Sequence, residues 1–239
     1  MTDSVVDELE RRIEALQGRI REQEVWKAVT GRTTPASQVQ AIMREIYLEI
    51  VWYQPDVIEA TIAVIGQMPR SLAPRRVRAM LLHQVEEWDH GEMALRDYVG
   101  LGGSEGFARG SRPSASAWAV AAYWRMLAHK RDPFAYLGAL YLFEGLTPRV
   151  TGEVKAHLQA KQMGAESLEY VEFHSTEDIK HQNLVRQLID SLAHEPHARE
   201  AMLHGIDCFE HVYPIPCWNA AYLRALAGGS EPALQALAS

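Results

Sequence analysis

The segment His174-Ser175-Thr176-Glu177-Asp178-Ile179-Lys180-His181 decides how the rest of the chain is interpreted. His174, Asp178 and His181 stand at positions i, i+4 and i+7 of a long helical pattern, so their side chains are expected on a narrow arc of one helix face. Two imidazoles and a carboxylate suit a divalent transition metal such as iron, which accepts nitrogen and oxygen ligands. Glu177 falls outside this arc, so we expect Asp178 to be the carboxylate ligand.

The composition indicates one soluble domain. The chain has 239 residues, of which 47% are hydrophobic and 23% charged, and no Gly/Ser-rich or charge-block linker divides it. Its net charge of −7 comes without a basic stripe, which disfavours a nucleic-acid partner. Cys208 and Cys217 are too few for a disulfide framework, the acidic first residues are unlike a signal peptide, and no segment has the apolar length of a membrane span. We therefore expect a cytoplasmic protein without a membrane or nucleic-acid partner.

Helical periodicity covers nearly the whole chain and strand alternation is missing, which predicts an all-α fold. We expect eight helices, at about 3–28, 33–53, 56–68, 74–100, 114–130, 133–161, 166–193 and 196–226, with Pro55 ending the second and 104–114 forming the longest loop. The first helix carries an apolar seam, so residues 1–30 should lie on the body of the same domain or form a dimer contact. Residues 31–227 form the single helical domain, and 228–239 a loose tail.

A second segment with ligand-forming residues lies between 83 and 90. Glu87 and His90 are spaced i, i+3, and His83 stands one turn before Glu87 on the same side. Glu86 and His90 make an equally good i, i+4 pair. The spacing alone therefore leaves Glu86 and Glu87 as alternatives.

A third segment places a carboxylate inside an apolar helix. Glu144 directly follows the uncharged run Phe134 to Phe143, and an ionised carboxylate is almost never buried without a partner. A metal ion is one such partner, and an arginine such as Arg149 is the other. Pro148 removes the backbone donor that would bond the Glu144 carbonyl, and it is expected to kink the helix there.

Together the three segments resemble the heme-oxygenase-like diiron oxidases and oxygenases, often described as iron-containing redox enzymes. That family carries a Glu and a His on one helix, a Glu on a later helix, and His-x3-Asp-x2-His near the end, and the resemblance covers about residues 36–226. It implies a heme-oxygenase-like (TenA-like) bundle of about seven to eight helices that holds two Fe(II)/Fe(III) ions, uses O2 as cosubstrate and has no heme. The implied metal ligands are Glu87, His90, Glu144, His174, Asp178 and His181.

The resemblance also implies the kind of reaction. Similar enzymes carry out N-oxygenation, desaturation or oxidative C–C cleavage of amino acids or fatty acids in specialised metabolism, and we expect an amino acid or a derivative as the small-molecule substrate. Glu87, His90 and His174 would bind mainly one iron, Asp178 and His181 mainly the other, and Glu144 would be shared. No catalytic residue beyond these ligands is assigned, and an external electron donor is a candidate partner. Around the metals we expect further side chains: His83, Glu86, Tyr141 and Tyr170 as candidates for hydrogen bonds to the ligands, Trp88, Trp118, Phe143 and Phe173 in the substrate pocket, and Arg44, Arg125, Arg149 or Lys180 for a substrate carboxylate.

Two alternatives remain open on the sequence. A ferritin-like carboxylate diiron protein would recruit Glu45 or Glu49 and would leave His174 without a role. A metal-free relative of the same fold, a thiaminase-type hydrolase or a binding protein, would need a cysteine nucleophile for hydrolysis, for which only Cys208 and Cys217 are available. A homodimer that uses the amphipathic leading helix is a further expectation.

Overall fold

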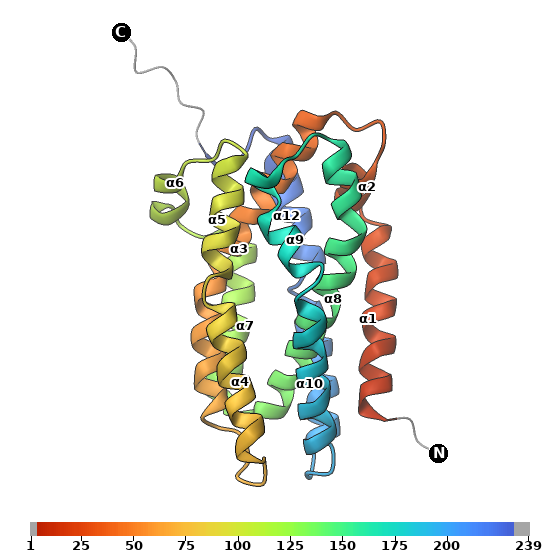
Figure 1. Cartoon of the computed structure of the whole chain (residues 1–239), viewed down its shortest axis with the longest axis vertical. Helices are drawn as coiled ribbons and strands as arrows, with labels where there is room; N and C mark the ends of the chain where they lie inside the picture. The colour runs from red at the N-terminus through yellow and green to blue at the C-terminus, as the bar shows by residue number, and fades with distance from the viewer. Residues whose placement is uncertain (1–3, 232–239) are drawn as a thin grey trace.

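The computed structural model describes residues 4–231, and in this range the chain is all-helical, as predicted. The helices form an elongated bundle whose long members run side by side (Figure 1). Residues 1–3 and 232–239, parts of the predicted leading helix and tail, lie outside the described residues. The elements are α1 (Val5–Arg21), α2 (Glu24–Thr30), α3 (Ala36–Ile65), α4 (Pro74–Glu87), α5 (His90–Gly100), α6 (Glu105–Gly110), α7 (Ala115–Lys130), α8 (Pro133–Ala160), the short 3-10 helix η1 (Ala165–Ser167), α9 (Glu169–His174), α10 (Asp178–Leu192), α11 (Ala198–Glu210) and α12 (Ile215–Leu226).

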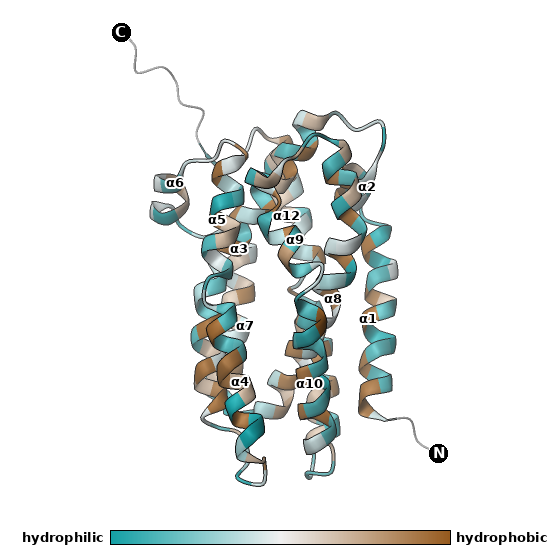
Figure 2. Ribbon diagram, viewed as in Figure 1, coloured by the Kyte–Doolittle hydropathy of each residue, from teal (hydrophilic) through white to brown (hydrophobic). Residues whose placement is uncertain are grey.

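The leading helix α1 packs on α8, α10 and α11 of the same chain. Its apolar seam is buried, and its outer turns are mainly hydrophilic (Figure 2). A methyl group added at Gly145 of α8 would lie 2.8 Å from Cδ1 of Ile13, so the two helices approach closely beside Glu144. Glu10 accepts hydrogen bonds from the side chains of Gln182, Tyr141 and Arg149. These contacts make α1 part of the core of the chain.

Two prolines lie inside helices that continue past them. The expectation that Pro55 ends a helix is wrong, because α3 runs from Ala36 to Ile65 without interruption. This helix packs against α5, α7 and α12, and that burial outweighs the one backbone hydrogen bond that Pro55 cannot make. In α8, which continues through Pro148, the hydroxyl groups of Thr147 and Thr151 donate to backbone carbonyls one turn earlier.

Two predicted long helices are each divided at the positions of the expected ligands. The segment 74–100 forms α4 and α5, with the break at Trp88 and Asp89. The segment 166–193 forms η1, α9 and α10, with a turn at 175–177. His174 is therefore the last residue of α9 and Asp178 the first of α10, so the expectation of one continuous helical arc is wrong. The predicted loop 104–114 also contains the short helix α6.

The core is centred on α8, which packs most extensively against α11 and α10. A methyl group added at Gly138 or Gly205 would lie 1.8 or 1.9 Å from a backbone carbonyl oxygen of the other helix, so α8 and α11 cross with their backbones in contact. At the other end of the chain, residues 228–231 are tied down, since the backbone N–H of Ser230 donates to Glu45 and the carboxylate of Glu231 accepts from Tyr98. No helix within residues 4–231 has both the length and the apolarity to cross a membrane.

Candidate metal centre

Four buried side chains from three helices meet inside the bundle: His83 and Glu87 from α4, Glu144 from α8 and His181 from α10. One ligand atom of each lies within 4.8 Å of the corresponding atoms of the other three. Nε2 of His83 is 3.4 Å from a carboxylate oxygen of Glu87 and 3.4 Å from one of Glu144. Nδ1 of His181 is 3.2 Å from Glu87 and 3.6 Å from Glu144. We call these four residues the tetrad.

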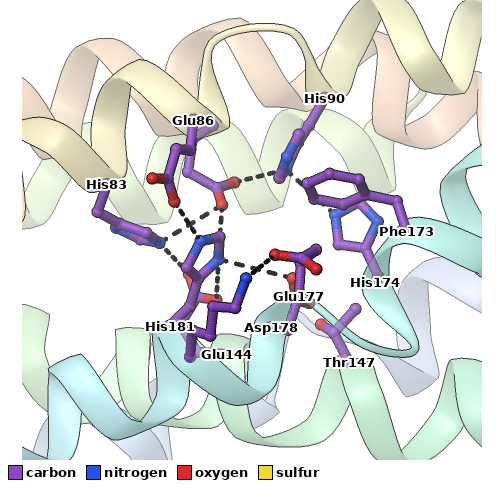
Figure 3. A network of polar contacts seen from close by, with 12 residues as sticks. His83, Glu86, His90, Glu144, Thr147, Phe173, His174, Glu177, Asp178 and His181 are labelled. Carbon is purple, nitrogen blue, oxygen red and sulfur yellow. Dashed lines mark hydrogen bonds and ion pairs between the residues drawn. The ribbon is translucent and has the colours of Figure 1, made fainter.

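A second group of possible ligands adjoins the tetrad (Figure 3). Nδ1 of His90 is 2.8 Å from the other carboxylate oxygen of Glu87, and Nε2 of His174 is 3.1 Å from that same His90 nitrogen. Asp178 approaches from the tetrad side, with Oδ1 3.6 Å from Nδ1 of His181. Glu87 therefore stands between the two groups, and the structure brings together all six ligands that the resemblance implied.

The arrangement differs from the expected division of ligands in two ways. His83, expected only around the ligands, lies within the tetrad itself. Its position one turn before Glu87 was the signal in the sequence, but the spacing could not show that Glu144 would approach it from another helix. Glu87 rather than Glu144 is the carboxylate that contacts histidines of both groups.

The buried donor atoms fit a transition metal. Nε2 of His83, Nε2 of His90, Nδ1 of His181 and Oδ1 of Asp178 are all inaccessible to solvent and have no hydrogen-bond partner. Buried polar atoms in proteins are normally paired, and an unpaired one needs an explanation such as a bound ion. Mixed imidazole and carboxylate donors suit iron, so these residues have the chemistry and the unused lone pairs to hold it.

Electrostatics in the tetrad favour a positive charge at its centre. Burial opposes ionisation of Glu87, but the neighbouring imidazoles of His181, His83 and His90 hold its pKa well below the ordinary value. Burial likewise disfavours charge on His83, yet Glu144 and Glu87 raise its pKa to about 10. The pKa of His181 is also raised, against the effect of burial, by Asp178, Glu144 and Glu87. Without metal, protons on the imidazoles supply the positive charge that a metal ion would bring.

The second group has the opposite protonation pattern. Burial, followed by the neighbouring His90, lowers the pKa of His174 to about 4, so this imidazole is neutral and can act as a ligand at neutral pH. Burial raises the pKa of Asp178 to about 7, with Glu144 and Glu87 adding to the rise and His181 opposing it. A nearby cation would favour the ionised form of Asp178.

His181 and His174 each have one ring nitrogen in contact with an oxygen outside the centre, which orients the other ring nitrogen toward the centre. Nε2 of His181 is 2.9 Å from a carboxylate oxygen of Glu86, whose side chain is 61% exposed, while Glu87 is buried. Nδ1 of His174 is 2.7 Å from the backbone carbonyl of Tyr170. A metal-bound histidine usually donates its outer N–H to such an oxygen, which fixes the tautomer and increases the basicity of the inner nitrogen.

Gln84 is a neighbour of the centre that the sequence analysis missed. Its side-chain amide nitrogen is 3.2 Å from Nδ1 of His83, and both residues are buried. This contact holds the imidazole from the side opposite Nε2, the atom that faces Glu87 and Glu144.

Several predicted neighbours of the centre lie elsewhere. Tyr141 donates its hydroxyl to Glu10 of α1. Trp88 and Trp118 are 67% and 69% exposed on the surface, and Phe143 packs in the aromatic core beside Trp124. Phe173 does reach the centre, where its ring lies edge-on to His90 with the ring centroids 5.1 Å apart.

A half-open cavity begins beside the centre, and the empty space in it and in front of its mouth, open solvent included, is about 720 Å³. Thr147, one turn after Glu144, and Tyr170, whose ring stacks on His174 at 3.8 Å, line its inner end together with Tyr213. Trp88, Trp118, Phe143 and Phe173 do not line it. The cations expected to bind a substrate carboxylate do not line the cavity either. Arg125, Arg149 and Lys180 pair with acidic side chains elsewhere, and Arg44 is absent from the lining.

The carboxylates needed for a ferritin-like centre have other partners. Glu45 and Glu49 are buried, and both accept hydrogen bonds from the guanidinium of Arg224. Glu49 also accepts from the thiol of Cys217, at 3.1 Å. Their side chains connect α3 to α12 and are not among the residues of the tetrad.

Comparisons with known proteins concern the family and the fold of this chain. A family model described as "iron-containing redox enzyme" matches residues 50–213. A solved domain of unknown function with a heme oxygenase-like fold from Shewanella denitrificans superimposes with a TM-score of 0.81 at 17% identity, covering 98% of this chain and 97% of that one. TenA homologues from Pseudomonas syringae and Pyrococcus furiosus give TM-scores of 0.73 and 0.72 at 11% and 14% identity, covering 93% and 91% of this chain and 93% and 100% of theirs.

No curated protein matches the sequence. The solved structures share too little identity to show more than the fold, whereas the family model covers more than half of the chain. The chain belongs to the family of iron-containing redox enzymes and has the heme-oxygenase-like fold.

Proposed function

We propose that this protein is a non-heme diiron oxidase or oxygenase, which uses O2 to oxidise a small molecule. The observation that carries the proposal is the convergence of three carboxylates and four imidazoles, all buried, in which four donor atoms have no hydrogen-bond partner. Membership of the iron-containing redox enzyme family supports an oxidoreductase in general. The donor set supports bare iron ions, because heme iron takes one or two axial ligands from the protein and has no use for several carboxylates.

The side chains would divide the work of holding metal between two groups. His83, Glu144 and His181, with Asp178 beside His181, would bind one ion, and His90 and His174 the other, with Glu87 shared between them. Two ferrous ions would supply the electrons with which dioxygen is first reduced. The protein contributes ionised carboxylates that stabilise the metal charge, neutral imidazoles with fixed tautomers, and a buried site that excludes water.

The substrate would enter through the cavity and lie against Thr147, Tyr170 and Tyr213. Tyr170 connects substrate and metal most directly, because its ring lines the cavity and stacks on His174 while its carbonyl accepts the N–H of the same histidine. A reaction that consumes more electrons than the substrate provides would need an external donor, which stays a proposal.

A metal-free hydrolase of the same fold is less well supported. The thiol of Cys217 is buried, and burial together with Glu49 raises its pKa well above the ordinary value, so it is a poor nucleophile. Cys208 lies on α11, which contributes no residue to the tetrad or to the cavity lining.

The test is anaerobic reconstitution with Fe(II), followed by metal counting and by absorbance measurements after exposure to O2. We expect about two irons per chain and a spectral change with O2, which a substrate would accelerate. Asp178→Asn should retain about one iron per chain. The control is Glu177→Gln, which changes the neighbouring carboxylate that pairs with Lys180 on the surface, and it should retain both irons. Wild-type protein that binds no iron and shows no response to O2 would rule out this function.

A further inference from the structure

The outer face of α4 is apolar, although the described part of the chain leaves it exposed. The helix lies at the outside of the bundle and packs mainly against α3 and α10 (Figure 1). Its inner face buries two residues of the tetrad, His83 and Glu87. Its outer face presents four large hydrophobic side chains: Leu81, Leu82, Val85 and Trp88, which are 47%, 53%, 72% and 67% exposed. We call these four residues the α4 stripe.

The stripe is continuous along the helix. Leu81, Val85 and Trp88 are spaced i, i+4 and i+7, and Leu82 precedes Val85 by three residues. Of the eleven large hydrophobic residues that are exposed within residues 4–231, four therefore lie on about two turns of one helix. Single exposed hydrophobic residues are normal, but a contiguous patch marks an interaction site, and a helix that is apolar on two faces is normally buried on both.

The area of the stripe fits an interface between two proteins. With about 250 Å² for a fully exposed tryptophan and about 180 Å² for a leucine or valine, the exposed fractions correspond to roughly 500 Å² of mainly apolar surface. A typical stable interface buries about 800 Å² on each partner, of which about 60% is apolar, and this share is also close to 500 Å². The stripe therefore supplies the apolar part of one side of such an interface.

Charges of opposite sign stand at the two ends of the stripe. The first turns of α4 carry the exposed Arg75 and Arg78, and within residues 4–231 no ion pair involves either of them. At the other end, the side chains of Glu86 and Asp89 are each 61% exposed. The hydropathy of α4 changes accordingly from hydrophilic first turns to hydrophobic middle turns (Figure 2).

This order of charges makes the stripe complementary to itself. A second α4 that runs in the opposite direction would place its carboxylates beside the arginines of the first at both ends. A second α4 that runs in the same direction would place arginines beside arginines and carboxylates beside carboxylates, which repel.

We propose that two copies of this chain associate through their α4 stripes, with the two helices antiparallel across a two-fold axis. Such a contact uses the same patch on both copies, so this one helix supplies every feature that it needs. The leading helix, which was the expected dimer contact, instead buries its apolar seam against its own chain. The proposal does not depend on the proposed function.

The test is the mass of the metal-free protein, measured by sedimentation velocity at concentrations from about 1 to 100 μM. For the wild type we expect a dimer with a dissociation constant of about 10 μM or lower. Val85→Lys should raise this constant at least about 100-fold, because it brings two ammonium groups into the apolar centre of the contact. The matched control is Leu223→Lys, which changes a 64% exposed leucine of α12 and should leave the constant unchanged.

A charge reversal tests the orientation of the two helices. Arg78→Glu alone and Asp89→Arg alone should each weaken the dimer about tenfold, because each puts like charges together at both ends. The variant with both substitutions should regain the wild-type constant, which a folding defect could not produce.

Three results would overturn the proposal. A wild type that is monomeric at about 100 μM would show that the stripe does not bind a second copy. A dimer that persists unchanged in Val85→Lys would use another surface. A double variant that associates no better than either single variant would contradict the antiparallel arrangement.

Discussion

Metal binding to the tetrad should become much tighter as the pH rises from 6.5 to 8.5. The pKa of His83 is about 10 and that of His181 is raised as well, so both imidazoles carry a proton throughout this range in the metal-free protein. A metal ion can bind only after these protons leave, and each proton released gives about a tenfold gain in apparent affinity per pH unit. Two protons therefore predict a gain of about 100-fold per pH unit.

The assay is a competition titration with Co(II) as a redox-stable probe against a chelator whose own pH dependence is known. A weakly buffered solution with an indicator dye would count the released protons at the same time, and about two per ion entering the tetrad are expected. His83→Asn removes one of the two titrating groups, so its affinity should change only about tenfold per pH unit.

Two results would refute this reasoning. A wild-type affinity that changes by less than about tenfold per pH unit would mean that the tetrad histidines are not protonated in the metal-free protein. Equal slopes for the wild type and His83→Asn would mean that His83 releases no proton when the metal binds.

Three further predictions concern stability and the surroundings of the metal. The pKa of His83 in the folded chain exceeds its ordinary value of 6.5, so protonated His83 stabilises the fold fully below pH 6.5, and this stabilisation is lost as the pH rises toward 10. Thermal unfolding of the metal-free protein should therefore show a decrease of up to about 5 kcal/mol in the free energy of unfolding over this range. Bound metal should abolish the decrease. Glu86→Gln should weaken metal affinity about 10- to 100-fold, because it removes the carboxylate behind His181. The control is Glu172→Gln, which changes an exposed carboxylate that pairs with Lys155, and equal affinities for the two variants would contradict the role of Glu86. Arg224→Met should destabilise the fold by about 3–5 kcal/mol in urea denaturation, because it leaves the buried carboxylates of Glu45 and Glu49 without the guanidinium that bonds to both. A loss below about 1 kcal/mol would contradict this role of Arg224.

The sequence located the centre because ligand chemistry is local. The helical periodicity predicted an all-α protein, and the spacings around Glu87, Glu144 and Asp178 identified three segments whose residues meet. The sequence did not show that the helix breaks between His174 and Asp178, or between Glu87 and His90, because no proline or glycine marks either turn. It also overestimated Pro55, where the packing of α3 on its neighbours outweighs one missing hydrogen bond.

By itself, then, the sequence determined which residues can bind a metal and on which helical segments they lie, since residue type and spacing are properties of the chain. Only the tertiary structure decided that His83 joins the tetrad, that Glu87 rather than Glu86 faces inward, and that Glu87 contacts histidines of both groups. Only it showed that Trp88 and Trp118 lie on the surface and do not line the cavity. The physical reason is that these outcomes depend on how helices far apart in sequence rotate and pack against one another, which no local spacing contains.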